Sequence, residues 1–219
     1  MFDDSISAEL PEHEDWIHSH AISLLKSRYG INTAVVQSER TYCQHFYMMF
    51  TERAGREVQG LNYGFPLRHR SWCNSVLKRG PINKWQNAVG KHKAIVGIAA
   101  DEPKRITRAI TKGQILPLVD YGITEAEAFD ICRRAGFLSP AYNKGRERLG
   151  CWFCHNQRIN EMRRLRHEYP ELWNRLVTME DDSRWKFKQG KTLEQFDRRF
   201  AREDMQMVLP FGEEAEDAS

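Results

Sequence analysis

Residues 150–155 read Gly-Cys-Trp-Phe-Cys-His and place Cys151 and Cys154 three positions apart. A C-x-x-C segment closed by a tight turn presents two thiolates to one metal ion. Zinc ions and iron–sulfur clusters usually take four protein ligands, so the segment predicts two more ligands elsewhere in the chain. The other cysteines are Cys43, Cys73 and Cys132.

We expect Cys73 and Cys132 to be the two missing ligands. Cys73 falls in the first turn of a helix predicted from Ser71 toward Ala88, and Cys132 falls in the last turn of the helix predicted after Thr124. Both helix ends are expected to face the loop before the C-x-x-C. A site of three cysteines with His155 is the alternative. Cys43 falls inside a predicted helix, where a buried small residue is the more ordinary interpretation. A redox pair is the weaker interpretation of the C-x-x-C, since the segment lies late in the chain and follows a basic loop.

Positive charge is concentrated around these cysteines. The net charge of the 219-residue chain is only +3, but residues 133–166 contain nine Lys or Arg against two Glu. A basic zone beside a metal-type motif indicates an anionic ligand, such as a nucleotide phosphate, sulfate or a nucleic-acid backbone. A solvated helix face is the alternative that charge alone leaves open.

The composition indicates a soluble, cytoplasmic protein. No apolar run approaches the roughly 18 residues of a membrane span, so we expect no association with a membrane. The first fifteen residues carry six acidic side chains, unlike the basic and then apolar order of a secretory signal. In a reducing compartment the cysteines are expected to be metal ligands, redox thiols or buried residues rather than disulfides.

Two β-branched or apolar runs predict strands between helical segments. They cover residues 33–38 and 93–99, and the second is apolar on both faces, as a central parallel strand is. Strands that alternate with helices through short connections are typical of a parallel sheet with crossover helices. We therefore expect an α/β fold.

Helix boundaries are marked by capping residues. A helix is predicted to begin at Pro11 and end at Gly30. Another begins after Thr124, whose capping box with Glu127 is typical of a helix start, and ends at Gly136. A helix is also predicted over 41–51. Beyond Cys154 only helices are predicted, over 156–169, from Pro170 onward and over 192–205, which together form a helical appendage.

Polar residues follow the predicted strand 93–99. The carboxyl ends of parallel strands open into the crevice where such sheets bind ligands. Asp101, Glu102 and Arg105 are therefore candidate site residues. The alternative for Asp101 is that it caps the helix that starts at Pro103.

Four stretches resemble, in order, motifs of the phosphoadenosine phosphosulfate (PAPS) reductase family, within the adenine nucleotide alpha-hydrolase-like (ATP-pyrophosphatase) superfamily. The most specific is similar to the cysteine motif of the family's phage- and prophage-type members. The resemblance extends from Phe2 to about Trp173. The four stretches are Asp3-Asp4-Ser5 with Glu9-Leu10-Pro11-Glu12, Trp72-Cys73 with Lys78, Gly97 to Glu102 with Arg105, and Arg148 with Gly150 to Cys154.

The resemblance implies a nucleotide-binding protein with an iron–sulfur cluster. We expect an α/β core over residues 1–155, a helical region over 156–211 and a disordered acidic tail over 212–219. In relatives that reduce adenylyl sulfate or take part in DNA phosphorothioation, comparable cysteines hold a [4Fe-4S] cluster, which is expected here with zinc as the alternative. The expected ligands of that metal centre are Cys73, Cys132, Cys151 and Cys154. The residues expected to contact ATP, another adenine nucleotide or an anion are Asp4, Ser5, Lys78, Asp101, Glu102, Arg105 and Arg148.

The chain departs from the family in its phosphate contacts. The Ser-Gly-Gly-Lys-Asp-Ser phosphate-binding loop (PP-loop) is absent from the sequence, Ala99 replaces an expected strand arginine, and no cysteine follows Cys154. We therefore expect sulfur or nucleotidyl-transfer chemistry on an adenine nucleotide or nucleic acid, with the PP-loop supplied by a partner chain or an upstream segment. The alternative is a non-catalytic, metal-stapled basic module that binds nucleic acid or a partner protein.

Overall fold

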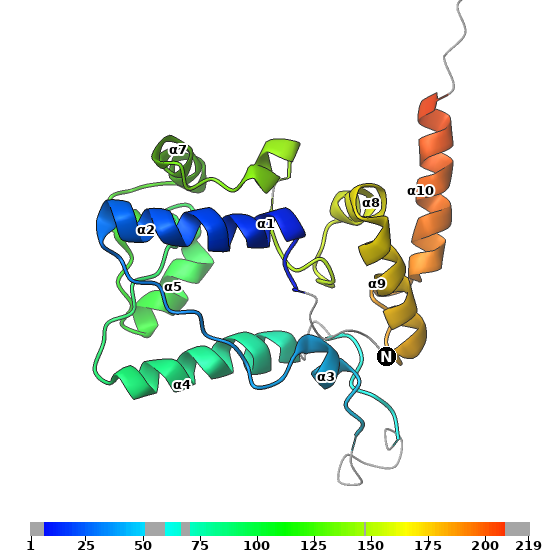
Figure 1. The fold of residues 1–219 in the computed structure, drawn as a ribbon, viewed down its shortest axis with the longest axis horizontal. Coiled ribbons are helices and arrows are strands. Elements are labelled where there is room, and N and C mark those ends of the chain that lie inside the picture. The colour runs from blue at the N-terminus through cyan, green and yellow to red at the C-terminus, as the bar shows by residue number, and fades with distance from the viewer. Residues whose placement is uncertain (1–6, 51–59, 67–70, 147, 209–219) are drawn as a thin grey trace, which may run out of the picture. The chain divides into compact units, whose positions relative to one another are not determined.

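Helices form most of the described chain. The computed structural model describes residues 7–50, 60–66, 71–146 and 148–208 (Figure 1). Helix accounts for 58% of the structure and strand for 3%, with no sheet among the described residues. Pairing between extended segments there is limited to isolated bridges, such as the parallel bridge of Ile95 with Ile115. The prediction of an α/β fold with a parallel-sheet adenine nucleotide alpha-hydrolase-like core is therefore wrong.

The chain divides into two compact units and passes between them four times. The first unit comprises Met1–Ala8, Arg40–Trp72 and Gly150–Ser219. The second comprises Glu9–Glu39 and Cys73–Leu149. Each unit is described by itself below.

The second unit is a set of helices. A rod of three successive helical segments opens it (Figure 1). Pro11 begins this rod and Gly30, with φ of +66°, ends it, which confirms both predicted boundaries. The helices are α1 (Pro11–Trp16), the π-helix η1 (Ile17–Ala21), α2 (Ile22–Tyr29), the π-helix η3 (Cys73–Arg79), α4 (Gly80–Val89), α5 (Pro103–Thr111), α6 (Pro117–Asp120), α7 (Glu125–Ala135) and the 3-10 helix η4 (Pro140–Lys144).

The capping box predicted for α7 is present. The Thr124 side chain accepts a hydrogen bond from the Glu127 backbone N–H, and the Glu127 carboxylate accepts from the Thr124 N–H at 2.8 Å. Gly136 adopts φ of +79° and ends the helix. The Thr124 contacts hold the pKa of Glu127 below its usual value. Local cap chemistry therefore fixes this helix as the sequence predicts.

The two predicted strands lack the neighbours that a sheet requires. Residues 33–38 form no strand, and Val35 is 61% exposed. Residues 93–99 pair only locally with the segment at Ile115, where the Val96 N–H donates to the Ile115 carbonyl at 3.0 Å. Ile95 remains 70% exposed. A parallel strand is normally covered on both faces by helices and bonded to neighbouring strands. The apolar run alone therefore did not determine a sheet.

The described residues of the first unit form four helices around an aromatic and aliphatic core. They are α3 (Tyr42–Phe46), α8 (Ile159–Glu168), α9 (Pro170–Asp182) and α10 (Leu193–Val208). The last three confirm the predicted C-terminal helices, including the start at Pro170. The fully buried core includes Phe46, Phe65, Met162, Leu176 and Phe200. The predicted tail over 212–219 lies outside the described residues.

Helix α3 is shorter than the predicted helix over 41–51. Beyond Phe46 the backbone pairs with residues 61–63 instead: the Phe50 N–H donates to the Leu61 carbonyl at 2.9 Å, and the Tyr63 N–H donates to the Met48 carbonyl at 3.0 Å. These long-range bonds replace the helical ones that local propensity favours. Tertiary pairing therefore overrides the helical pattern after one turn.

A buried carboxylate in α9 fixes the segment that precedes α10. Glu180 is 4% exposed, and its two oxygens accept hydrogen bonds from the backbone N–H of Phe187 at 2.8 Å and of Leu193 at 2.7 Å. A buried carboxylate is stable only where such donors replace water. Glu180 therefore ties residues 183–192, named here the basic hairpin, to the end of α9 and the start of α10.

None of the helices in the described part of the chain combines the length and the apolar character needed to cross a bilayer.

Candidate metal-binding turn

The C-x-x-C forms a closed turn in the first unit. The Cys154 N–H donates to the Cys151 carbonyl at 2.9 Å, and the Gln157 N–H donates to the Cys154 carbonyl at 2.9 Å. Both cysteines are free thiols of intermediate exposure. The first and last residues of a tight turn have Cα atoms within about 7 Å of each other, so the turn brings two cysteines close enough to serve one metal ion.

Side-chain hydrogen bonds hold the turn closed. The Gln157 amide donates to the carbonyls of Cys151 at 3.1 Å and Trp152 at 2.8 Å. The Trp152 indole N–H donates to the Ser7 carbonyl at 2.8 Å, and its backbone N–H donates to the Ala8 carbonyl at 3.0 Å. The turn is therefore positioned before any metal binds.

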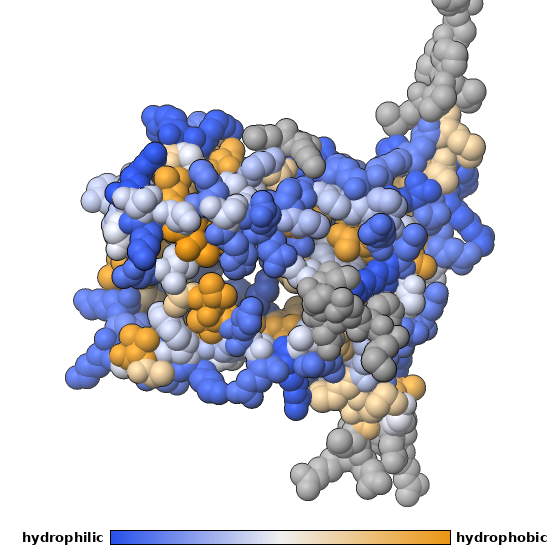
Figure 2. Space-filling view, viewed as in Figure 1, coloured by the Kyte–Doolittle hydropathy of each residue, from blue (hydrophilic) through white to orange (hydrophobic). Residues whose placement is uncertain are grey.

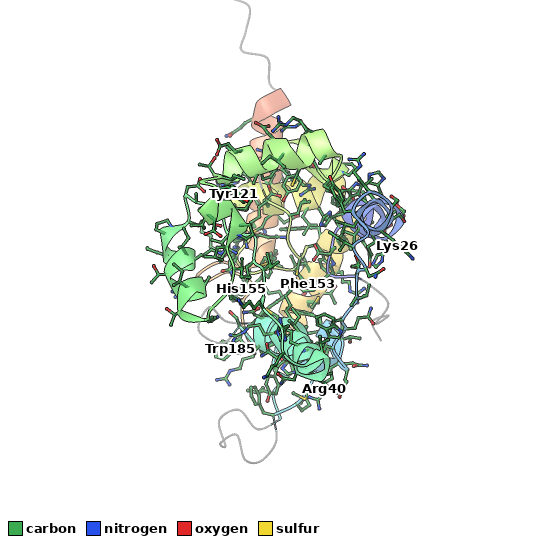
Figure 3. The ribbon with its side chains drawn as sticks, turned by 90° about the vertical axis from the view of Figure 1, so that its left-hand side faces the viewer. Lys26, Arg40, Tyr121, Phe153, His155 and Trp185 are labelled. Carbon is green, nitrogen blue, oxygen red and sulfur yellow. The ribbon has the colours of Figure 1, made fainter. Side chains whose placement is uncertain are left out.

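The two residues between the cysteines anchor the turn in the core. Trp152 is 2% exposed and Phe153 is 6% exposed. The Phe153 ring lies 3.9 Å from the ring of Tyr42, which in turn lies 4.8 Å from that of Trp72. Phe153 and His155 are labelled in Figure 3. The apolar side chains point inward and leave the sulfurs as the polar atoms of the turn.

Lys188 of the basic hairpin reaches under the turn. Its ammonium donates to the His155 carbonyl at 2.6 Å and also to the Gln157 carbonyl. Burial lowers the pKa of Lys188, and the negative charge of a Cys154 thiolate partly offsets that shift. The Lys188 ammonium therefore places a positive charge beside the Cys154 side chain.

His155 has two ring nitrogens that no described group satisfies. Both are buried without a hydrogen-bond partner among the described residues. Burial lowers the pKa of His155, and the Lys188 charge lowers it further. The imidazole is therefore neutral near pH 7 and keeps a lone pair, as a metal ligand must. This chemistry fits the alternative ligand set that includes His155.

His45 is a second buried histidine of the first unit. It is 5% exposed, and neither ring nitrogen has a partner among the described residues. Its ring lies 4.3 Å from that of Trp72 and 4.9 Å from that of Tyr63. Burial lowers the pKa of His45, followed by the Arg40 charge. No sequence signal distinguished it from an exposed histidine.

The other two predicted cysteine ligands belong to the second unit. Cys73 is the first residue of η3, and Cys132 lies in the last turn of α7. Both are free thiols of intermediate exposure. In the described part of the chain no three His, Cys, Asp or Glu side chains are grouped closely enough to hold a metal ion. The four-cysteine site remains a prediction, since its halves lie in separate units.

The structure pairs two of the predicted anion-binding residues, Glu102 and Arg105, and gives Asp101 a different partner. In the second unit, Arg105 donates to the Glu102 carboxylate at 2.6 Å and 2.9 Å. Asp101 accepts from the Glu125 N–H at 3.1 Å, so it caps α7 and not the helix that begins at Pro103. The Glu102 carboxylate also accepts from the Ala99 N–H at 3.3 Å.

The remaining predicted contacts are dispersed. Lys78 lies near the end of η3, and Arg148 is exposed in the loop before the C-x-x-C. Asp4 and Ser5 lie outside the described residues. The nucleotide contacts therefore remain predictions. Sequence analysis missed Gln157 and Lys188, because nothing in the local pattern links either side chain to the cysteines.

Two proteins of Methanocaldococcus jannaschii are similar to this chain. Uncharacterized protein MJ0066 is 30% identical over 124 residues, which cover 52% of this chain and 26% of the relative. Uncharacterized protein MJ0973 is 28% identical over 123 residues, which cover 52% of this chain and 30% of the relative. No family model and no solved structure matches the chain. The matched region thus spans less than a third of these longer relatives.

Proposed function

We propose that this chain is the cysteine-bearing part of a protein of the PAPS reductase family. It binds a [4Fe-4S] cluster, with zinc as the alternative, and acts in sulfur or nucleotidyl-transfer chemistry on an adenine nucleotide or nucleic acid. The observation that carries the proposal is the closed C-x-x-C turn, whose geometry is fixed by Gln157 and Trp152.

The turn suits thiolate ligation for three reasons. Its backbone is closed by its own hydrogen bonds, its inner side chains are buried, and the Lys188 cation lies beneath it. A preformed turn lowers the ordering cost of metal binding. Cys151 and Cys154 would hold the metal centre together with Cys73 and Cys132. When bound, a cluster would supply electron transfer or electrostatic stabilisation, and zinc would supply a structural link.

His155 is the alternative fourth ligand. Its neutral imidazole and its two buried nitrogens suit a metal bond. In that arrangement one of the distant cysteines would remain a free thiol. Substitution of individual ligands separates the two possibilities.

The phosphate-binding loop is proposed to come from another chain or segment. The two curated relatives extend far beyond the matched region, so additional sequence accompanies this region in those proteins. The second unit also exposes apolar side chains that an accompanying segment would cover, among them Ile95, Trp85 and Val89. Figure 2 shows orange patches over α2 and α4 of this unit. A cytoplasmic location, which keeps the thiols reduced, belongs to this proposal.

Metal analysis of protein purified without oxygen tests the proposal. A cluster predicts about four irons with matching sulfide per chain, and structural zinc predicts about one zinc. Serine substitution of Cys73, Cys132, Cys151 or Cys154 should each remove the metal. Cys43→Ser is the matched control, since Cys43 is another free thiol of the first unit, contacted by Arg175 at 3.5 Å.

Two results would contradict the ligand assignment. Metal that persists in Cys73→Ser or Cys132→Ser but is lost in His155→Gln would favour the histidine set. Purified chain with no iron or zinc in any preparation would overturn the proposal of a metal centre.

Calorimetry with ATP or adenylyl sulfate tests the proposed nucleotide binding. We expect no binding by the chain alone and binding when a PP-loop partner is added.

A further inference from the structure

Helix α10 separates its charges between two faces. Its aspartates point toward α8: Asp204 accepts from Arg163 at 2.5 Å, and Asp197 accepts from Arg166 at 2.7 Å. Asp204 also pairs with His167 at 3.0 Å, and these partners, with Arg163 foremost, lower its pKa. Both aspartates of the helix are therefore paired with residues of α8 inside the first unit.

The opposite face of α10 lines a basic groove. The groove has a volume of about 390 Å³. Its lining contains four cationic side chains, from Lys191, Arg198, Arg199 and Arg202, and no acidic residue. Gln195 adds an uncharged polar side chain to the same wall. We name this feature the α10 groove.

Much of the cationic charge of the groove remains available. Arg198 pairs with Glu194 one turn away, but both side chains are more than 65% exposed, so water screens this pair. Arg199 pairs with Glu203 at 2.6 Å. Lys191 and Arg202 have no acidic partner among the described residues. The groove therefore offers at least two cations to an external anion.

The basic hairpin extends the positive surface. Its residues 183–192 contain four Lys or Arg and no Asp or Glu. Arg184 lies 4.7 Å above the ring of Trp185, a half-buried side chain labelled in Figure 3. Gly190, with φ of +83°, turns the chain so that Lys191 stands directly before the capped start of α10. Lys188 is engaged with the cysteine turn and takes no part in this surface.

The spacing of the cations matches a linear polyanion. Gln195, Arg198 and Arg202 follow positions i, i+3 and i+7 and so lie on one face of the helix. Lys191 lies just before the helix, and from Gln195 to Arg202 the helical rise is about 10 Å. A nucleic-acid duplex carries one charge per about 1.7 Å of its axis, so roughly six phosphate charges fall within that length. A single small anion would leave most of the groove unused.

We propose that the α10 groove binds nucleic acid through the sugar–phosphate backbone. Arginine and lysine contacts to phosphate give affinity without base specificity. The groove has no exposed apolar side chain for insertion into a bilayer, since Phe196 is 5% exposed, and this argues against an anionic membrane as the partner. The groove lies apart from the cysteines, so the inference does not depend on the proposed metal centre.

Salt-dependent binding of fluorescent DNA tests the groove. Anisotropy would be measured with a 20-nucleotide strand and a 20-base-pair duplex over a series of salt concentrations. The variant is Lys191→Gln with Arg202→Gln. The matched control is Lys104→Gln with Arg108→Gln, because these exposed cations of α5 are also unpaired among the described residues and their loss changes the net charge equally.

Loss of two phosphate contacts should weaken duplex binding by about tenfold or more at 0.1 M salt and reduce the slope of log K against log salt by about 2. The control should lose less than about twofold. Circular dichroism would show unchanged helicity in both variants. Their metal content should match that of the unmodified chain, which keeps this test distinct from that of the metal centre.

Three results would overturn the inference. The first is absence of measurable DNA binding by the unmodified chain. The second is an equal loss in both double variants, because that would indicate attraction by net charge alone. The third is binding to anionic vesicles or polyglutamate as tight as to DNA, because the partner would then be a different class of molecule.

Discussion

Replacing the buried carboxylate of α9 should both destabilise the first unit and loosen the start of α10. In Glu180→Gln, one amide oxygen still accepts a hydrogen bond, but the amide NH2 faces the second backbone donor. One buried N–H is then left without an acceptor, and a charge-assisted bond becomes neutral, so we expect a loss of about 2 to 3 kcal/mol. Glu180→Ala leaves the backbone N–H groups of both Phe187 and Leu193 without an acceptor and should lower the free energy of unfolding by about 4 kcal/mol.

Urea unfolding followed by tryptophan fluorescence measures both losses as shifts in midpoint at constant slope. Asp181→Asn is the control, since the neighbouring side chain is exposed and its loss should change stability by less than about 0.5 kcal/mol. A loss below about 1 kcal/mol in Glu180→Ala would refute the reasoning, because two buried backbone donors cannot lose their acceptor at so small a cost.

Three further substitutions test local features. His45 has its pKa lowered by burial, so the unfolded state takes up a proton first and stability should fall as pH drops below about 6.5; His45→Phe should flatten that decline, and an unchanged pH profile of the unfolding free energy would contradict it. Gly64→Ala would place a Cβ atom 2.3 Å from the Ser183 hydroxyl at φ of +61°. It should lower the free energy of unfolding by about 2 kcal/mol more than Gly60→Ala, where no atom lies within 4 Å of the added Cβ. Equal unfolding midpoints in urea would show that the close contact relaxes freely. Thr124→Ala removes the cap of α7 and should lower the free energy of unfolding by about 1 kcal/mol, whereas Thr124→Ser keeps the hydroxyl and should change it little. Thermal unfolding of the two variants measures the difference, and equal losses of stability in both would contradict a capping role.

The helices could be predicted where their ends carry a local signal. Gly30 and Gly136 adopt positive φ and end their helices as predicted, and Pro170 begins α9. These features depend on neighbouring residues alone. The run at 93–99 led to a wrong prediction of a sheet, because an apolar run does not specify which strand it would pair with. Ile95 is exposed, so no helix or strand among the described residues covers this side of the run.

The sequence predicted the cysteine motif of the candidate site but not the residues that hold the motif in place. The C-x-x-C is visible in the sequence, but its supports come from Ser7, Gln157 and Lys188. The first and last lie far away along the chain, and only the tertiary structure brings them to the turn. The basic hairpin beside the α10 groove does carry a sequence signal, namely four cations and no acid over residues 183–192.

Because the chain passes repeatedly between its two units, neither unit can complete its folding early in synthesis. The ring contacts among Tyr42, Trp72 and Phe153 join residues from widely separated parts of the first unit. While the ribosome is still producing residues before 150, the early members of this set have no final partner and leave aromatic surface uncovered. Neither unit corresponds to a continuous stretch of gene, so neither can be lost or transferred by a simple end deletion without damaging the other.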